Sequence, residues 1–326
     1  MIFLCRWHHF CGLLITTTLV LLAAASPSFA YYTIRSISLD TESPDRTAFG
    51  KLTWQGGFEI TGDDKRFGGL SALQVSTDGK RLIAVTDRGH WLTATLAYRE
   101  GQLSGASNFQ ITPLLDLIGQ PLSGRRADAE SLAVDNDGLF VSFERNHRIW
   151  RYAKDAYRNG SKPTAVAAPD GLRTLQKNGG IEAMTRLCDG RLLAVAEKSV
   201  THPNSVDAWI QSETGWQTLA YRTTDGLSPT GATTLPNCDV LFVERSFSVI
   251  AGLDICITRL PSSAFDASSA LNPEVLANLS DPLTIDNFEG ISARRDASGN
   301  TLIYIVSDDN FSATQRTLLM MFALKE

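Results

Sequence analysis

Short apolar runs alternate with turns along most of the chain, and the pattern recurs five times. Each copy has an apolar strand, a turn that usually contains Asp, and a second apolar strand that ends in an acid. Those second strands are Leu82–Thr86, Leu139–Phe143, Leu192–Ala196, Val240–Val243 and Leu302–Ser307. One such unit cannot bury both of its faces, so the copies must stack on one another. The pattern therefore predicts a repeat array rather than a two-domain enzyme.

The spacing of the repeats suggests their architecture. The acids that end the second strands are 47 to 64 residues apart, at Asp87, Glu144, Glu197, Glu244 and Asp308. Steps of this size suit a four-stranded antiparallel blade. We therefore predict an all-β fold, a β-propeller of five or six four-stranded antiparallel blades closed by N- and C-terminal strands. Closure is expected by pairing of Lys51–Gln55 with Gln315–Leu324. The interval around the termini is long enough to contain a sixth blade, so the sequence allows either number.

The first 30 residues have the features of a secretory signal peptide. A weakly positive head precedes an apolar stretch from Gly12 to Ala25, and small residues precede Tyr31. We expect a mature protein from about Tyr31, with residues 31–326 forming a single domain. The predicted location is periplasmic or secreted, with no membrane span after signal cleavage.

Charge and cysteine content narrow the function further. The net charge is −5 without basic runs, so nothing predicts nucleic-acid binding. Outside the first 30 residues three cysteines remain, which allow at most one intramolecular bridge. We predict Cys238–Cys256 across a hairpin of the fourth repeat, with Cys188 as the competing partner of Cys238. The absence of CxxC and HExxH argues against zinc, and that of GxSxG, P-loop and GxGxxG motifs argues against serine hydrolases, NTPases and dinucleotide enzymes.

Antiparallel geometry gathers acids at one end of the array. The start of each first strand and the end of each second strand share one face, so Glu130, Glu182 and Glu289 are expected beside the five strand-end acids. Crowded carboxylates attract hard cations such as Ca²⁺. Four of the strand-end acids are followed by Arg or Lys, and adjacent side chains alternate faces along a strand. In the alternative interpretation each acid therefore pairs with a basic residue of the neighbouring blade, and the ring is structural.

The last repeat is the richest in acids. The predicted metal ligands are therefore Glu130, Glu182, Glu289, Asp308 and Asp309. Arg316 follows the same repeat and is the candidate to stabilise developing charge, or else only neutralises Asp308 or Asp309. His90 is a candidate catalytic base, as is His147, because each follows a strand-end acid; the alternative for both is a histidine in a surface loop.

Several short motifs together resemble one family. They are Phe67-Gly-Gly-Leu-Ser71, Asp87-Arg-Gly89, Asp128-Ala-Glu-Ser-Leu132, Val141-Ser-Phe-Glu-Arg145, Leu241-Phe-Val-Glu-Arg-Ser-Phe247, Asn287-Phe-Glu-Gly290, Ser307-Asp-Asp-Asn-Phe311 and Gln315-Arg-Thr-Leu-Leu319. The set resembles the phytase-like family of exported bacterial proteins, described as having esterase-like activity of phytase. The resemblance spans about Gly50 to Leu324. It implies a β-propeller, a periplasmic or secreted location and calcium-assisted phosphoester hydrolysis.

Two functions follow from these expectations. The first is an exported, Ca²⁺-assisted phosphoesterase or esterase that acts on a small-molecule substrate, such as a phosphoester, at the acidic mouth. The alternative is a non-catalytic periplasmic propeller that binds a ligand or a protein at the same face, which the fold permits equally.

Overall fold

The computed structural model describes residues 30–198, 204–248, 252–267 and 270–325. Residues 1–29, which include nearly all of the predicted signal peptide, lie outside the described residues. Within the described part of the chain, no helix has the length and apolar character needed to cross a membrane.

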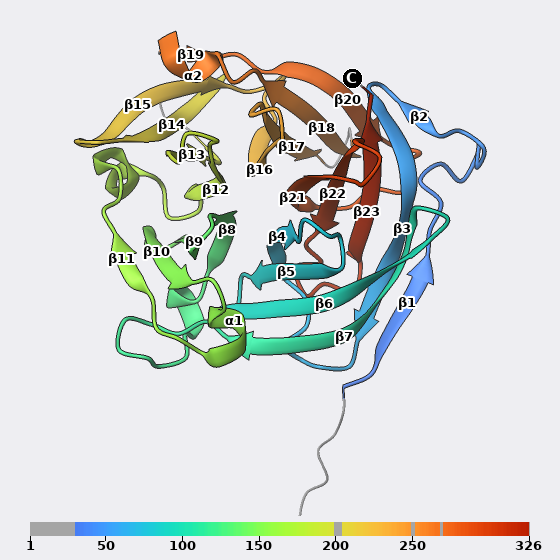
Figure 1. Cartoon of the computed structure of the whole chain (residues 1–326), viewed down its shortest axis with the longest axis horizontal. Coiled ribbons are helices and arrows are strands. Elements are labelled where there is room, and N and C mark those ends of the chain that lie inside the picture. Colours follow the sequence, from blue (N-terminus) through green and yellow to red (C-terminus); the bar gives the residue numbers. More distant parts are fainter. Residues whose placement is uncertain (1–29, 199–203, 249–251, 268–269, 326) are drawn as a thin grey trace, which may run out of the picture. The chain divides into compact units, whose positions relative to one another are not determined.

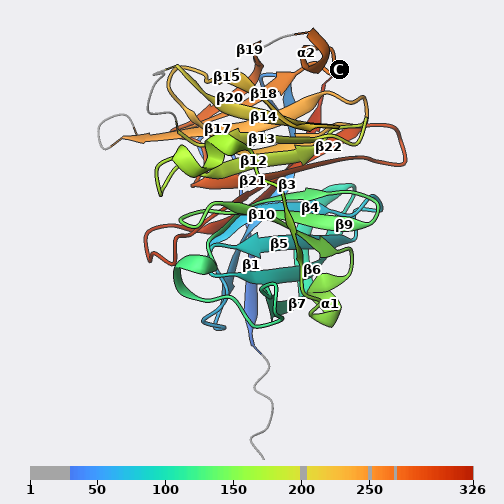
Figure 2. The ribbon, with the colours of Figure 1, turned by 90° about the vertical axis from the view of Figure 1, so that its left-hand side faces the viewer.

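Five small antiparallel sheets form a ring, which makes the fold a five-bladed β-propeller (Figure 1). Blade 1 consists, from the axis outwards, of β4 (Leu70–Val75), β5 (Arg81–Thr86), β6 (His90–Arg99) and β7 (Gln102–Pro113). Blade 2 consists, in the same order, of β8 (Ala129–Val134), β9 (Gly138–Phe143), β10 (Arg148–Ala153) and β11 (Thr164–Val166). In the side view of Figure 2, blade 1 lies in the lower part of the ring and blades 3 and 4 lie in the upper part.

The remaining three blades follow the same order. Blade 3 contains β12 (Ile181–Arg186), β13 (Leu192–Ala196), β14 (Ser205–Ser212), β15 (Gly215–Arg222) and the short parallel β19 (Ala270–Leu271). Blade 4 contains β16 (Ser228–Thr234), β17 (Val240–Ser248), β18 (Gly252–Leu260) and β20 (Glu274–Ser280). Blade 5 contains β21 (Phe288–Arg295), β22 (Thr301–Ser307), β23 (Thr317–Leu324), β3 (Leu52–Gly62) and β1 (Tyr32–Ser36), with β2 (Ala48–Phe49) paired to β3.

Helices are confined to the connections between strands. The described residues contain two one-turn α-helices, α1 (Ala156–Asn159) and α2 (Ala264–Ala267), and two 3₁₀ helices, η1 (Gly124–Arg126) and η2 (Asp170–Thr174). This agrees with the strand-dominated pattern of the sequence.

Blade 5 joins the two ends of the domain. β23 pairs antiparallel with β3, with Leu324 opposite Leu52 and Thr317 opposite Ile60. The predicted closure is therefore confirmed, and the segment that could have formed a sixth blade instead supplies the outer strands of the fifth. This extra pairing explains why the interval around the termini is longer than one repeat.

A buried apolar cluster fills each interface between neighbouring blades. Alternation along β17 shows how: Leu241 and Val243 pack toward blade 5, whereas Val240 and Phe242 pack toward blade 3. A blade strand therefore has two apolar faces, because successive side chains point to opposite sides of the sheet and both sides are covered. The continuous apolar runs of the second strands are the sequence signature of this arrangement.

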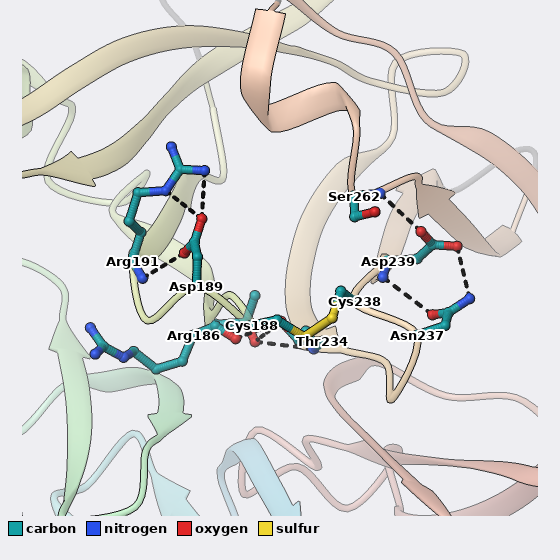
Figure 3. The surroundings of a disulfide bond; sticks show 10 residues. Arg186, Cys188, Asp189, Arg191, Thr234, Asn237, Cys238, Asp239 and Ser262 are labelled. Atoms are coloured by element: carbon teal, nitrogen blue, oxygen red, sulfur yellow. Dashed lines mark hydrogen bonds and ion pairs between the residues drawn. A yellow bond between two sulfur atoms is a disulfide. The ribbon is translucent and has the colours of Figure 1, made fainter.

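A disulfide ties blade 3 to blade 4 between two hairpin turns, and it corrects the predicted pairing. Cys188 and Cys238 are bonded with their Cα atoms 5.5 Å apart, whereas Cys256 is a buried free thiol (Figure 3). Val240, which follows Cys238 closely in the chain, lies opposite Leu260 of β18. Cys256 lies four residues from Leu260 along that strand. Four residues of strand span about 13 Å. That exceeds the roughly 7 Å that a disulfide can bridge.

Loss of the Cys188–Cys238 bond should destabilise the propeller measurably. The bond joins cysteines 50 residues apart, and removing such a constraint from the unfolded chain typically costs about 2–4 kcal/mol. We expect the Cys188→Ser, Cys238→Ser double variant to unfold at lower urea concentration than the wild type. Dithiothreitol should destabilise the wild type and leave the double variant unchanged; a wild type insensitive to reductant would contradict the assignment.

Candidate functional site

A β-bulge interrupts the inner strand of every blade at the same place. The pairing register between the inner strand and its neighbour shifts around the second residue of β4, β8, β12 and β21 and the third residue of β16. The bulged residues are Ser71, Glu130, Glu182, Thr230 and Glu289. Bulges re-aim side chains and are frequent next to active sites. Three of the five bulges thus present a glutamate at one end of the central channel, which we call the mouth.

The carboxylates at the mouth outnumber the cations beside them. The acids, linked by mutual charge interactions, are Asp87, Asp128, Glu130, Glu144, Glu182, Glu197, Glu289, Asp308 and Asp309. The basic side chains that adjoin them are Arg88, Arg145, Arg148, Lys198 and Arg245. The mouth is therefore strongly electronegative unless protons or a metal ion neutralise it.

Two groups of three carboxylates have the geometry to hold a metal ion. In each group one oxygen per residue lies within 4.8 Å of the others, and Glu144 belongs to both groups. The first group is completed by Asp128 and Glu130, the second by Glu182 and Glu197. Their all-oxygen donor set is the one that hard cations such as Ca²⁺ and Mg²⁺ prefer.

An unsatisfied oxygen nearby also fits a cation. Asp87 Oδ1 is buried and has no hydrogen-bond partner among the described residues. Gly69 makes this close packing possible: it adopts a φ of +63°, and a Cβ there would lie 2.1 Å from that same oxygen. A buried carboxylate oxygen without a donor is costly, so a bound cation or proton would relieve it.

Burial and mutual repulsion raise the pKa values of the mouth acids. Burial and then the neighbouring carboxylates hold the pKa of Glu130 and of Glu182 well above the usual range. Burial raises the pKa of Asp87 to about 7, with repulsion from Asp308 and Asp128. Burial, together with the charge of Glu289, raises the pKa of Asp308 to about 8. The protein without metal would therefore carry several protons here near neutral pH, and a cation would compete with them.

The acids of blade 5 are held mainly by protein donors. Glu289 Oε1 accepts hydrogen bonds from Arg245 Nη2 at 3.0 Å and from Asn287 Nδ2 at 2.8 Å. Asp308 Oδ1 accepts the Asn310 N–H, and Asp309 Oδ1 accepts the Gly69 N–H from blade 1. The carboxylate groups with metal-binding geometry lie in blades 2 and 3, although the last repeat has the highest density of acids.

The strand-end acids divide between the two interpretations of the sequence. Glu197 pairs with Lys198 at 2.6 Å, within the mouth. Glu244 is fully buried and bound by neutral donors: its Oε1 accepts from the hydroxyls of Tyr221 and Thr258, and its Oε2 from the Thr224 N–H. The expectation that all five strand-end acids share the mouth is therefore wrong for Glu244. Glu244 lies opposite Pro229, one residue before the position that Glu197 occupies in blade 3, so Arg245 stands at the strand end instead.

The two candidate catalytic residues lie apart from the carboxylate groups. Burial lowers the pKa of His90, and the charges nearest to it are those of Arg66, Asp64 and Arg88. Arg316 is committed to the loop before β21, because its Nε lies 3.3 Å from Asp286 Oδ2 and its Nη2 donates to the Ile285 carbonyl.

His147 is better placed than His90. Its Nδ1 is buried and has no hydrogen-bond partner in the described part of the chain, while its Nε2 lies 2.9 Å from the carbonyl oxygen of Gln176. A Cβ on Gly180 would lie 2.9 Å from the same Nδ1 and 3.1 Å from Glu144 Cγ, so the ring and this carboxylate flank one glycine. The position of His147 three residues after Glu144 was the signal in the sequence.

The fold and the mouth define a five-bladed β-propeller with an acidic channel end. The family described as "Phytase-like: Esterase-like activity of phytase" matches residues 65–311, and the chain belongs to this family. A search of curated proteins finds no match.

Solved propeller structures resemble the chain at low identity. A protein provisionally assigned as a gluconolactonase shares 12% identity with a TM-score of 0.46, over 92% of this chain and 96% of that one. An endo-arabinase from Bacteroides thetaiotaomicron shares 13% identity with a TM-score of 0.45, over 77% and 93% of the two chains. A protein of unknown function from Dyadobacter fermentans shares 10% identity with a TM-score of 0.44, over 90% and 91%. Similarity at this level carries no information about activity.

Proposed function

We propose that the mouth binds a divalent cation of the Ca²⁺ class and that the chain hydrolyses phosphoesters there. The observation that carries the proposal is the pair of carboxylate groups that share Glu144. The family description, esterase-like activity of phytase, supports the reaction class. A bound cation would supply Lewis-acid polarisation of a phosphoryl oxygen and a lower pKa for bound water.

The residues around the two groups suit the remaining tasks. Glu144 is fixed by the Gly180 N–H, which donates to its Oε1 at 3.2 Å. Arg145 is half exposed at the rim, with its Nε 2.5 Å from Asp128 Oδ2, and can orient an anionic substrate. His147 offers a ring nitrogen without a partner beside Glu144 and is the candidate to move a proton.

Replacing His147 should separate chemistry from cation binding. General acid–base groups typically contribute about 10²–10⁴-fold to a rate. We expect His147→Gln to lower kcat at least about 100-fold while leaving the calcium affinity unchanged, because His147 lies outside both carboxylate groups. The matched control is His90→Gln, which should retain activity because the nearest charges around His90 are not the acids of these groups. A His147→Gln variant with wild-type kcat would remove this residue from the mechanism.

The activity itself is tested with a chromogenic phosphomonoester and, in parallel, a chromogenic carboxylic ester. We expect calcium-dependent release of the chromophore. Glu130→Gln should abolish this release, and excess substrate should not restore it in either assay. Glu213→Gln, an exposed acid in the turn after β14, is the control and should match the wild type. Hydrolysis that is absent with every divalent metal would overturn the proposal.

A non-catalytic, ligand-binding propeller is the second candidate function. It is favoured by the placement of Arg316 and His90, neither of which adjoins the carboxylate groups. In that case calcium would bind at the mouth without any turnover. The two candidates therefore share the cation site and differ only in the hydrolysis assay.

We also propose that the chain is exported. The apolar N-terminal segment supports this location. A disulfide between Cys188 and Cys238 also suits an oxidising compartment. Fractionation of cells that express the full chain, with N-terminal sequencing of the product, tests for cleavage near Tyr31.

A further inference from the structure

A second hollow opens at the other end of the central channel. The inner strands run from the acidic mouth to this end, and the last residue of each one lines it: Val75, Val134, Arg186, Thr234 and Arg295. We call this hollow the distal funnel. It consists of two adjoining cavities of about 430 and 910 Å³ that share lining residues from all five blades. These volumes are in the range of small-molecule sites, about 300–1,000 Å³.

The charge of the distal funnel is opposite to that of the mouth. Its basic side chains outnumber its acids: Arg81, Lys154, Arg186, Arg294 and Arg295 against Asp135 and Asp137. Asp135 already accepts hydrogen bonds from the backbone N–H groups of Asp137 and Gly138. The funnel therefore has an excess of positive charge in a concave site, which favours an anionic ligand.

Arg186 is the central group of the funnel. Its side chain is about one-fifth exposed, and its Nε is buried and has no hydrogen-bond partner among the described residues. Its polar contacts are long: 3.8 Å from Nη2 to Asp135 Oδ2 and 3.4 Å from Nη1 to Gln211 Oε1. Its Cζ also lies 5.2 Å from the centre of the Phe140 ring. Figure 3 shows the side chain pointing away from the nearby disulfide. A guanidinium with unused donors is suited to bidentate binding of a carboxylate or phosphate group.

The backbone around Arg186 is held rigidly. Its carbonyl oxygen accepts the Thr234 hydroxyl at 2.7 Å, and the Thr234 N–H donates to the Thr185 hydroxyl oxygen. The disulfide two residues later fastens the same pair of blades. Such positioning reduces the entropic cost of ligand binding.

We propose that the distal funnel binds a small organic anion, carrying a carboxylate or phosphate group, through Arg186 with Arg295 at its rim. This site is separate from the cation site at the mouth and does not depend on the function proposed there.

Calorimetric titration of metal-free protein tests the proposal, with glycerol 3-phosphate and succinate as probes and glycerol as the uncharged control. We expect saturable binding of at least one anion, and the stronger of the two identifies phosphate or carboxylate as the preferred group. Arg186→Gln should weaken it about tenfold or more, the scale of a lost charged hydrogen bond. Asp135→Asn should strengthen binding of the anion, because it removes a negative charge that competes for Arg186. The amide keeps Oδ1, which accepts the two backbone hydrogen bonds.

Three further variants keep the result interpretable. Arg295→Gln changes an exposed side chain and should also weaken binding, even if Arg186→Gln proves unstable. Arg259→Gln, an arginine paired with Glu274 away from the funnel, should bind as the wild type does. Glu182→Gln at the mouth should likewise have no effect. Absence of saturable binding by both anions, or equal affinity in the wild type and both funnel arginine variants, would overturn the proposal.

Discussion

Arg245→Met should lower the free energy of unfolding by about 3–5 kcal/mol, the usual cost of removing one partner of a buried ion pair. The Arg245 side chain is about one-fifth exposed, and its Nη2 lies 3.0 Å from Glu289 Oε1. Burial alone would lower the pKa of Arg245, but the charges of Glu289, Glu182 and Glu197 raise it. Without this cation, all three carboxylates would lose a stabilising positive charge, although Glu197 would keep its ion pair with Lys198.

The loss should depend on pH in a defined direction. Burial raises the pKa of Glu289 to about 7 even with Arg245 present. Without Arg245 it would rise further, so the uncompensated charge would be neutralised by protonation in acid. We expect the destabilisation to be larger at pH 8 than at pH 5, measured by urea unfolding in chelator. Arg145→Met is the control: Arg145 is also an arginine paired with a mouth acid, Asp128, but it is about half exposed, so about 1 kcal/mol or less is expected. Equal losses for both variants would contradict this role of Arg245.

Calcium should remove a pH-dependent weakness of the metal-free propeller. The folded-state pKa values of Asp87 and Glu289 are raised to about 7 and that of Asp308 to about 8. Groups with raised folded-state pKa values stabilise the fold below their unfolded pKa, near 4, and that contribution is lost as the pH rises to about 8. In chelator the melting temperature should therefore fall between pH 5 and pH 8.

Bound calcium would replace the lost protons. At 100 times its dissociation constant it should add about 2.7 kcal/mol to the unfolding free energy. We expect a large rise in melting temperature on adding calcium at pH 8 and a small one at pH 5. A calcium effect equal at both pH values would contradict competition between protons and the cation.

The propeller could be predicted from the sequence because its signals are local. Apolar second strands such as Leu192–Ala196, with Asp-Gly turns before them, repeat at blade spacing. The number of blades could not be predicted from the sequence. β3 pairs with β23 from the other end of the chain, and the repeat pattern does not extend to β3. Closure of a ring is a long-range property, which local periodicity does not encode.

The mouth was predictable in its outline and not in its detail. Glu130 and Glu182 stand at bulges, which antiparallel direction alone places at one end of the channel. The contribution of Asp128 depends on how the loop before β8 folds back to the Glu144 backbone, whose N–H donates to the Asp128 carbonyl. Glu244 shows the opposite case: the sequence pattern aligns it with Glu197, but the strand register places it one residue earlier, opposite Pro229. There the hydroxyl of Tyr221 from the neighbouring blade donates to its carboxylate. Pairing of this kind depends on tertiary neighbours, as does the Cys188–Cys238 bond.

Calorimetric titration of the metal-free protein with Ca²⁺ at pH 8 tests the central claim most directly. The account predicts saturable binding that weakens about 10–100-fold in Glu182→Gln, at least the scale seen when groups around a metal site are lost. It also predicts that Glu244→Gln, which removes a buried acid outside both carboxylate groups, retains the wild-type calcium affinity despite lower stability. Absence of saturable calcium binding to the wild type, or equal affinity in the wild type and Glu182→Gln, would contradict a cation site at the mouth.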